Sequence, residues 1–100
     1  MAAHGEHYAL RVTGDSMFPH ICEGDIVIVR VQPDVESEDI AVVLVNGDEA
    51  TLKKVKKDSN GMTLYAYNLA VYEPHVYTNR EIAELPIIIS GKVVELRRKL

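Results

Sequence analysis

A period of two in the apolar residues, repeated along most of the chain, is the feature that most restricts its fold. Alternate side chains share a face on a β-strand, so this period and runs of β-branched residues predict strands. Such strands are predicted at residues 7–14, 25–31, 40–45, 50–57, 62–68 and 87–96. Turn residues separate them, and Asn46-Gly47 between two apolar runs strongly favours a hairpin. Only residues 78–85 could form a helix, within a looser stretch that contains Pro74 and Pro86. We therefore expect a mainly β chain with short, strongly bent sheets and little helix.

The last predicted strand, residues 87–96, carries apolar residues on both faces. It is expected to be a final strand pair or one long strand bent at Gly91. A strand at the end of a chain normally lies at a sheet edge, where exposed apolar residues promote aggregation unless a partner covers them. We therefore expect a homodimer that pairs through this strand with two-fold symmetry. The alternative is a central strand buried within one subunit.

Length and charge exclude several functions. A chain of 100 residues forms one domain, and its net charge of -4 gives no reason to expect direct nucleic-acid binding by this domain. The longest uninterrupted apolar run, Ile40 to Val45, is far below the roughly 20 residues that span a bilayer, so no membrane anchor is expected. No N-terminal segment has the pattern of a secretion signal. The expected compartment is the cytoplasm.

Cysteine and histidine do not indicate a metal site. The single cysteine, Cys22, cannot form an internal disulfide, and His20 beside it does not complete a metal-binding pattern. Cys22 is expected to be a small buried or half-buried apolar residue. His4 and His7 form one His-x-x-His pair, which is expected to lie in a solvated terminal segment. No metal and no cofactor is expected.

A serine interrupts the strands in the block "GDSMFP", where Ser16 follows Gly14 and Asp15. These residue types favour turns, so Ser16 could serve turn chemistry alone or could be a nucleophile. No histidine base is indicated, because His20 lies only four residues beyond the serine and the other histidines lie in no recognisable base motif. The second glycine of the G-x-S-x-G elbow and the late Asp-x-x-His of GDSL hydrolases are also absent.

A lysine can replace histidine as the base for a serine if burial keeps the lysine neutral. In the predicted strand "ATLKKVKK", Thr51, Lys53 and Val55 share one face. Val55 can help to desolvate Lys53, which lowers a lysine pKa, and the Thr51 hydroxyl can orient the amine. Lys54 lies on the opposite face and has no such neighbours. The alternative is a lysine-rich edge strand that only discourages aggregation.

Several motifs together resemble a known family. "GDSMFP", "EGDIVIV", "NGDEATLKKVKK" and "LYAYN" resemble, in this order, the C-terminal domain of LexA, lambda-type phage repressors and UmuD. These proteins are self-cleaving serine peptidases with a Ser-Lys dyad. The similarity runs from about Tyr8 to the end of the chain. Residues 1–7 are therefore expected to be a remnant of a linker or of an expression vector, and residues 8–100 the LexA-like peptidase and dimerisation domain.

The resemblance implies a LexA/signal-peptidase-like fold and a set of site residues. Ser16 matches the family nucleophile, and Lys53, 37 residues further on, matches the general base. Thr51 matches the hydroxyl residue that orients the lysine amine. Backbone N–H groups of Asp15 and Ser16 would bind the tetrahedral oxyanion. Leu69 departs from the pattern, because relatives often have proline there.

The implied function is that of a C-terminal domain of a LexA-like or prophage repressor, such as those of the SOS response. Self-cleavage would separate an upstream helix-turn-helix domain from the homodimer, with a possible RecA-type activator. The family cuts itself between a small residue and glycine, and the only early X-Gly bond here is His4-Gly5. The natural cleavage site is therefore expected to lie outside this chain. The alternatives are a UmuD-like polymerase accessory protein and a catalytically idle repressor dimerisation domain.

Overall fold

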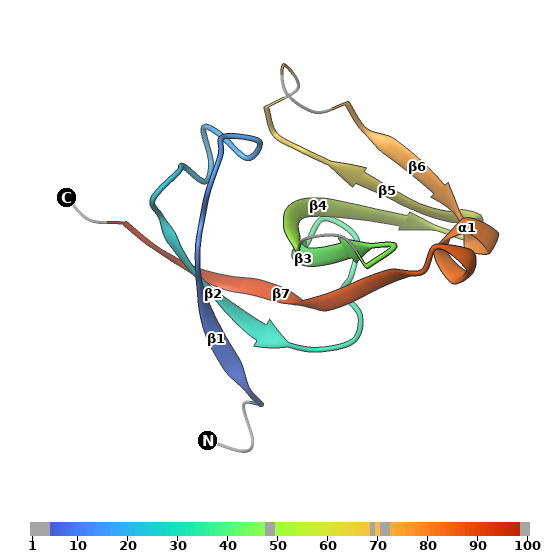
Figure 1. Cartoon of the computed structure of the whole chain (residues 1–100), viewed down its shortest axis with the longest axis horizontal. Helices are drawn as coiled ribbons and strands as arrows, with labels where there is room; N and C mark the ends of the chain where they lie inside the picture. Colours follow the sequence, from blue (N-terminus) through green and yellow to red (C-terminus); the bar gives the residue numbers. More distant parts are fainter. Residues whose placement is uncertain (1–4, 48–49, 69, 71–72, 99–100) are drawn as a thin grey trace.

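Seven antiparallel strands form one strongly bent sheet (Figure 1). The computed structural model describes residues 5–47, 50–68, 70 and 73–98. Its elements are β1 (His7–Arg11), β2 (Ile26–Val31), β3 (Ile40–Val45), β4 (Thr51–Asp58), β5 (Gly61–Tyr65), β6 (His75–Thr78), α1 (Asn79–Glu84) and β7 (Ile87–Arg97). The seven strands are arranged in the order β1-β2-β7-β3-β4-β5-β6. The prediction of a mainly β chain with little helix is confirmed.

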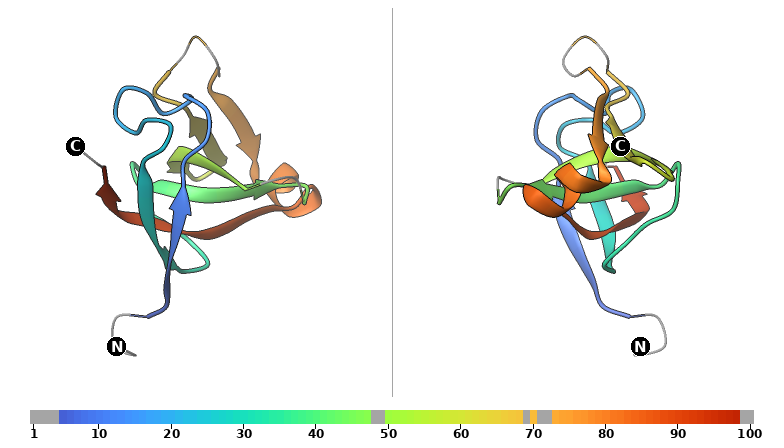
Figure 2. Two further views of the ribbon diagram at one scale, coloured as in Figure 1. Left: turned by 60° about the vertical axis from the view of Figure 1, so that its left-hand side comes forward. Right: turned by 90° about the vertical axis from the view of Figure 1, so that its right-hand side faces the viewer.

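Strand β7 lies in the middle of the sheet, so its predicted position at an edge is wrong. Residues 87–92 pair with β3, whereas residues 91–97 pair with β2. The strand therefore joins two halves of the sheet and, within the pairings described, most of its length is hydrogen-bonded to one neighbour at a time. β1 and β2 run at a steep angle to β3 and β4 (Figures 1 and 2). Sequence position did not predict this arrangement because β7 returns between strands that come much earlier in the chain.

Gly91 lies where β7 passes from one neighbour to the other. It pairs with Val31 of β2 and with Val42 of β3. A Cβ atom at this position would lie 2.4 Å from the carbonyl oxygen of Arg30, so no other residue fits without a backbone shift. The expectation of one long strand with glycine at its turning point is confirmed over the 11 residues of β7.

The bent sheet encloses two apolar clusters. The first cluster contains Val35, Ala41, Val43, Val55, Met62, Leu64, Ile87 and Ile89. The second contains Val12, Met17, Ile21, Val27, Val29, Val42 and Leu52. β3 supplies both, because its successive residues Val42 and Val43 point to opposite faces. The second cluster includes Met17, the residue after Ser16, and so it supports the segment that carries the serine.

Two hairpins connect the strands of the centre, and the first lies at the predicted Asn46-Gly47 turn. β3 and β4 pair after a turn in which Asn46 and Gly47 both have positive φ. These are the backbone angles that make Asn-Gly favourable in a tight hairpin. β4 and β5 pair after a second turn, where the Asp58 side chain accepts hydrogen bonds from the backbone N–H groups of Asn60 and Gly61. The two turns together place β4 between β3 and β5 in the sheet.

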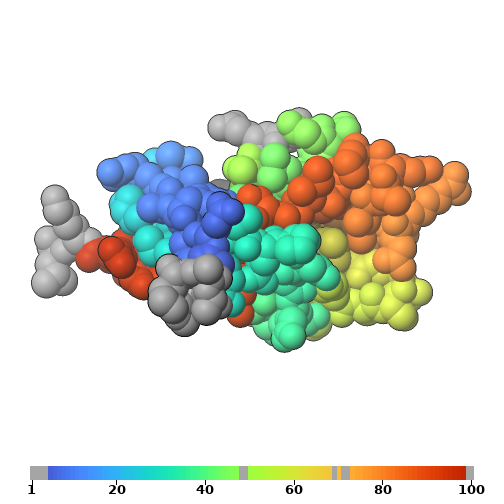
Figure 3. All heavy atoms as spheres, turned by 90° about the horizontal axis from the view of Figure 1, so that it is seen from below, coloured from blue at the N-terminus to red at the C-terminus, as the bar shows by residue number. Residues whose placement is uncertain are grey.

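The stretch before β7 contains a strand that the sequence pattern missed. β6 pairs with β5 at the end of the sheet, and three of its four residues are exposed, so it lacks a buried face with period two. The predicted helix follows as α1, and Thr78 and Glu81 cap it reciprocally. On the face shown in Figure 3, the C-terminal end of β7 lies beside the N-terminal quarter of the chain.

Candidate active site

The loop from Val12 to Asp25, here called the serine loop, carries Ser16 between β1 and β2. Two backbone hydrogen bonds close its base: Val12 N–H to Asp25 O (2.9 Å) and Gly24 N–H to Val12 O (2.9 Å). Ser16 is half-buried, and Met17 beside it is only 1% exposed within the second apolar cluster. A side chain anchored so deeply fixes the backbone next to the serine, so Ser16 is placed by packing as well as by turn geometry.

Asn68, just beyond β5, fastens the tip of the serine loop. Its backbone N–H donates to the Ser16 carbonyl (2.9 Å), and its Nδ2 donates to the Asp15 carbonyl (3.1 Å). A peptide unit is planar and trans, so a fixed Asp15 carbonyl directs the Ser16 N–H the opposite way. The motif "LYAYN" contained this asparagine, but sequence reasoning assigned it no role. Leu69, the departure from the family pattern, lies outside the described residues.

Lys53 is a buried lysine on β4. It is 5% exposed, and its Nζ donates a hydrogen bond to Thr51 Oγ1 at 3.0 Å. Burial lowers the pKa of the Lys53 amine from its ordinary value, because a charged amine is poorly solvated there. Val55, on the same face of the strand, is fully buried. Lys53 thus has an aliphatic neighbour, a hydroxyl partner and an amine whose pKa is lowered by burial.

The adjacent Lys54 has the opposite environment. Its Nζ forms an ion pair with Glu38 at 2.8 Å and lies 5.4 Å from the centre of the Tyr67 ring. The hydrogen bond to the Glu38 carboxylate raises the pKa of the Lys54 amine, so Lys54 stays charged. Two neighbouring lysines on one strand therefore differ in the property that a general base requires, and Lys53 has it.

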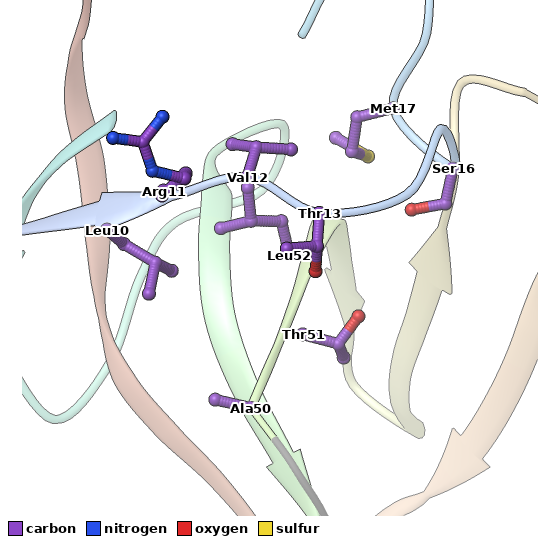
Figure 4. A pocket seen from close by; sticks show the side chains of 9 residues that line it. All are labelled: Leu10, Arg11, Val12, Thr13, Ser16, Met17, Ala50, Thr51 and Leu52. Atoms are coloured by element: carbon purple, nitrogen blue, oxygen red, sulfur yellow. The ribbon is translucent and has the colours of Figure 1, made fainter. Parts of the chain in front are cut away.

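A cleft of about 520 Å³ lies between the serine loop and the start of β4. Its lining residues are Leu10, Arg11, Val12, Thr13, Ser16, Met17, Ala50, Thr51 and Leu52. The hydroxyl groups of Ser16 and Thr51 are directed toward the space between them (Figure 4). Since Thr51 also accepts the hydrogen bond of Lys53, the predicted nucleophile, the predicted orienting residue and the predicted base converge on one region.

The histidines that the structure describes lie in aromatic or exposed surroundings. The His20 ring packs against Tyr67 with 3.9 Å between the ring centres, and His75 stacks on Tyr77 at 4.2 Å. His7 is exposed on β1. His4 lies outside the described residues. Among the residues that the structure describes, no group of three or more His, Cys, Asp or Glu side chains could hold a metal ion.

A model of the Peptidase S24-like family matches residues 1–94, which include Ser16, Thr51 and Lys53. The chain belongs to the Peptidase S24-like family. It is 37% identical over 99 residues to the LexA repressor of Ruegeria sp. (strain TM1040), covering 98% of this chain and 39% of that repressor. It is 41% identical over 99 residues to the LexA repressor of Geobacter sp. (strain M21), and this match covers 98% of the chain and 47% of that repressor.

A third relative of this S24-like chain is the LexA repressor of Novosphingobium aromaticivorans, at 40% identity over 96 residues. That match covers 95% of the chain and 38% of the repressor. The S24-like chain thus spans less than half the length of these curated relatives. The resemblance to the C-terminal part of LexA, and the serine peptidase class that it implied, are confirmed. In the part of the S24-like chain that the structure describes, no helix has the length and apolar character to cross a membrane.

Proposed function

We propose that Ser16 and Lys53 are the nucleophile and the general base of a self-cleaving peptidase. One observation carries the proposal: a buried lysine with a lowered pKa bonds to Thr51, whose hydroxyl lines the same cleft as Ser16. A Ser-Lys pair needs a lysine that can lose its proton near neutral pH, and burial supplies that property.

The neutral Lys53 amine takes the proton of Ser16 Oγ as this oxygen attacks the peptide carbonyl carbon. Backbone N–H groups of Asp15 and Ser16 stabilise the resulting oxyanion. The C–N bond then breaks, and the leaving amine receives the proton from Lys53. Water attacks the acyl carbon while Lys53 accepts a proton from the water. The bond between this carbon and Ser16 Oγ then breaks, and Lys53 returns the proton to Ser16 Oγ, which restores both residues.

The cleft has a shape that suits an extended peptide segment. Residues 10–13 form one wall and residues 50–52 the other, and both walls consist of consecutive residues at the end or start of a strand. The volume of about 520 Å³ is in the range of ordinary ligand sites, roughly 300 to 1,000 Å³. An extended segment lying between the walls would bring one peptide carbonyl close to Ser16.

The broader role that we propose is the C-terminal domain of a LexA-like or prophage repressor in the cytoplasm. Cleavage would separate an upstream helix-turn-helix domain from a homodimer of this domain, with a RecA-type activator as a possible trigger. Residues 93–97 of β7 pair with β2 on one side only, within the pairings described, and they include the exposed Val94 and Leu96. This edge can accept the same strand of a second copy.

Self-cleavage tests the proposed function. The chain is expressed together with the segment that its gene encodes upstream and is incubated at pH 7 to 10, and mass spectrometry identifies the products. We expect one cut between a small residue and glycine upstream of Ser16, faster at higher pH and absent in Ser16→Ala. An uncut protein at every pH, with or without an activated RecA-type filament, would point instead to a catalytically idle dimerisation domain.

A further inference from the structure

An ion pair between a half-exposed arginine and a buried carboxylate joins Arg98 to the serine loop. The Asp25 carboxylate is only 4% exposed, at the base of that loop. Arg98, just beyond β7, donates from Nε to Asp25 Oδ1 (2.9 Å) and from Nη2 to Asp25 Oδ2 (2.7 Å). Two parallel hydrogen bonds of this kind fix the relative orientation of a guanidinium and a carboxylate. On the face shown in Figure 3, the C-terminal end of β7 lies beside the N-terminal quarter of the chain.

The same carboxylate also organises the loop internally. Asp25 Oδ2 accepts a hydrogen bond from the Cys22 N–H at 2.7 Å, and the Asp25 N–H donates to the Cys22 carbonyl at 3.0 Å. The neighbouring Ile21 N–H donates to the carbonyl of Met17 at 3.0 Å. A continuous set of contacts therefore runs from Arg98 through Asp25 and the turn at residues 21–22 to Met17, which is bonded covalently to Ser16.

The serine loop needs such contacts because no regular strand or helix is described within it. A loop of this kind gains rigidity only from its contacts, whereas a nucleophile must be held within a fraction of an ångström of its productive position. Asn68 holds the tip of the loop and Met17 its centre. Asp25 and Arg98 hold the base.

Resting on the proposed peptidase function, we propose that Asp25 and Arg98 are positioning residues for Ser16, so that the residue directly after β7 completes the site. Neither residue touches the substrate. Both act through the backbone of the serine loop, by keeping the Ser16 hydroxyl and its neighbouring N–H groups in register with Thr51 and Lys53.

The reactivity of Ser16 toward a fluorophosphonate tests this proposal on the 100-residue chain, without any need for a cleavage site. The second-order rate constant of labelling is measured from pH 7 to 11, and peptide mass spectrometry locates the label. We expect Arg98→Ala to lower the rate constant about tenfold or more at every pH, since a misplaced reacting group costs up to about a hundredfold. The pH midpoint, set by Lys53, should not move.

Two variants and one additive sharpen the test. Arg98→Lys should recover only part of the reactivity, because one ammonium group cannot bind both carboxylate oxygens as the guanidinium does. Added guanidinium chloride, at concentrations far below those that unfold proteins, should partly restore Arg98→Ala and leave wild type unchanged. Arg97→Ala is the matched control, because Arg97 pairs only with the exposed Glu95 among the contacts described, and it should react like wild type.

Each outcome decides the proposal. If Arg98→Ala is folded at the assay temperature and reacts at the wild-type rate, the pair serves stability alone and the proposal is wrong. If Arg98→Ala does not fold, a folded Arg98→Lys that reacts at the wild-type rate overturns it equally. A wild-type chain that is not labelled at Ser16, or a Lys53→Ala variant that is labelled as fast, refutes the dyad itself, and the positioning role falls with it.

Discussion

Lys53 Nζ donates a hydrogen bond to Thr51 Oγ1 at 3.0 Å, and the two residues lie on one face of β4. Burial lowers the pKa of the amine and so favours its neutral form, and the contact with Thr51 can orient that amine. Thr51 connects this buried lysine to the cleft that contains Ser16. Several measurable consequences follow from this relationship and from the contacts around it.

Replacement of Lys53 by methionine should stabilise the fold at neutral pH. The pKa of Lys53 is lower in the folded chain than in the unfolded chain. At a pH between these two pKa values the unfolded state binds more protons than the folded state, so the stability of the fold rises with pH. The Lys53→Met variant has no amine to desolvate on folding, so it should melt at a higher temperature than wild type at pH 7. The difference should disappear as the pH rises past the usual lysine value of 10.5.

Lys54→Met is the control for this measurement. The pKa of Lys54 is raised by Glu38, so its charged form is favoured by folding and its loss should not raise the melting temperature at pH 7. Equal stabilisation by both substitutions would mean that the gain comes from added apolar surface and not from the burial of Lys53.

Asn68→Ala should slow the labelling of Ser16 while the chain stays folded. The variant loses the hydrogen bond from Nδ2 to the Asp15 carbonyl. Such a bond contributes about 1 kcal/mol, and if all of this energy serves to position the serine, its loss slows labelling roughly fivefold. Asn79→Ala removes a similar bond, to the Ser59 carbonyl at 2.9 Å, and should react like wild type. Equal rates for the two variants would show that Asn68 does not position the serine.

Asp25→Asn should be less stable than wild type at pH 7, but not in strong acid. The Arg98 guanidinium beside Asp25 lowers the pKa of that carboxyl to about 2, from 3.8 in the unfolded chain. The stabilising charge is therefore present above pH 4 and is lost as the pH falls toward 2. Melting temperatures of wild type and variant should converge over this range. A difference that stays constant down to pH 2 would argue against the ion pair as its cause.

The 100-residue chain should dimerise through the second half of β7. Sedimentation equilibrium should show a monomer–dimer equilibrium with a dissociation constant of about 1 micromolar or tighter, as for a specific interface of ordinary size. Val94→Asp should give folded monomer, because Val94 is 43% exposed. Val93 is less suitable for this test than the sequence suggested, since it packs against the second apolar cluster.

Val76→Asp provides the comparison for the dimer experiment. Val76 is an exposed valine, 66% exposed, on β6 at the other end of the sheet, and its substitution should leave the dimer intact. A wild-type chain that stays monomeric at high concentration would contradict the dimer. Dissociation by Val76→Asp instead of Val94→Asp would place the interface elsewhere.

Local patterns predicted the elements that depend on local chemistry. The period of two gave six of the strands, Asn46-Gly47 gave a hairpin, and the alternation around Lys53 gave the face that it shares with Thr51. The family motifs paired Ser16 with Lys53 as nucleophile and base, which the residues alone left open. β6 was missed because it is short and mostly exposed.

Long-range contacts account for what the sequence did not predict. The central position of β7 depends on which strands it returns between, and no local pattern records that choice. The bonds from Asn68 to the serine loop and from Arg98 to Asp25 join residues far apart in the chain. An asparagine at a strand end and an arginine near a terminus have many ordinary explanations, and only the folded chain distinguishes among them.

The pH dependence of fluorophosphonate labelling at Ser16, in wild type and in Lys53→Ala, tests the central claim most directly. The labelling rate of wild type should increase as the pH rises from 7 and then reach a plateau. The midpoint of this increase should lie below pH 10.5, because burial lowers the pKa of Lys53. A general base accelerates a reaction by about a hundredfold or more, so Lys53→Ala should react at least that much more slowly. Lys54→Ala should retain most of the reactivity, and Ser16→Ala should take no label. A rate that is independent of pH, or a loss confined to Lys54→Ala, would contradict the assignment of Lys53 as the base.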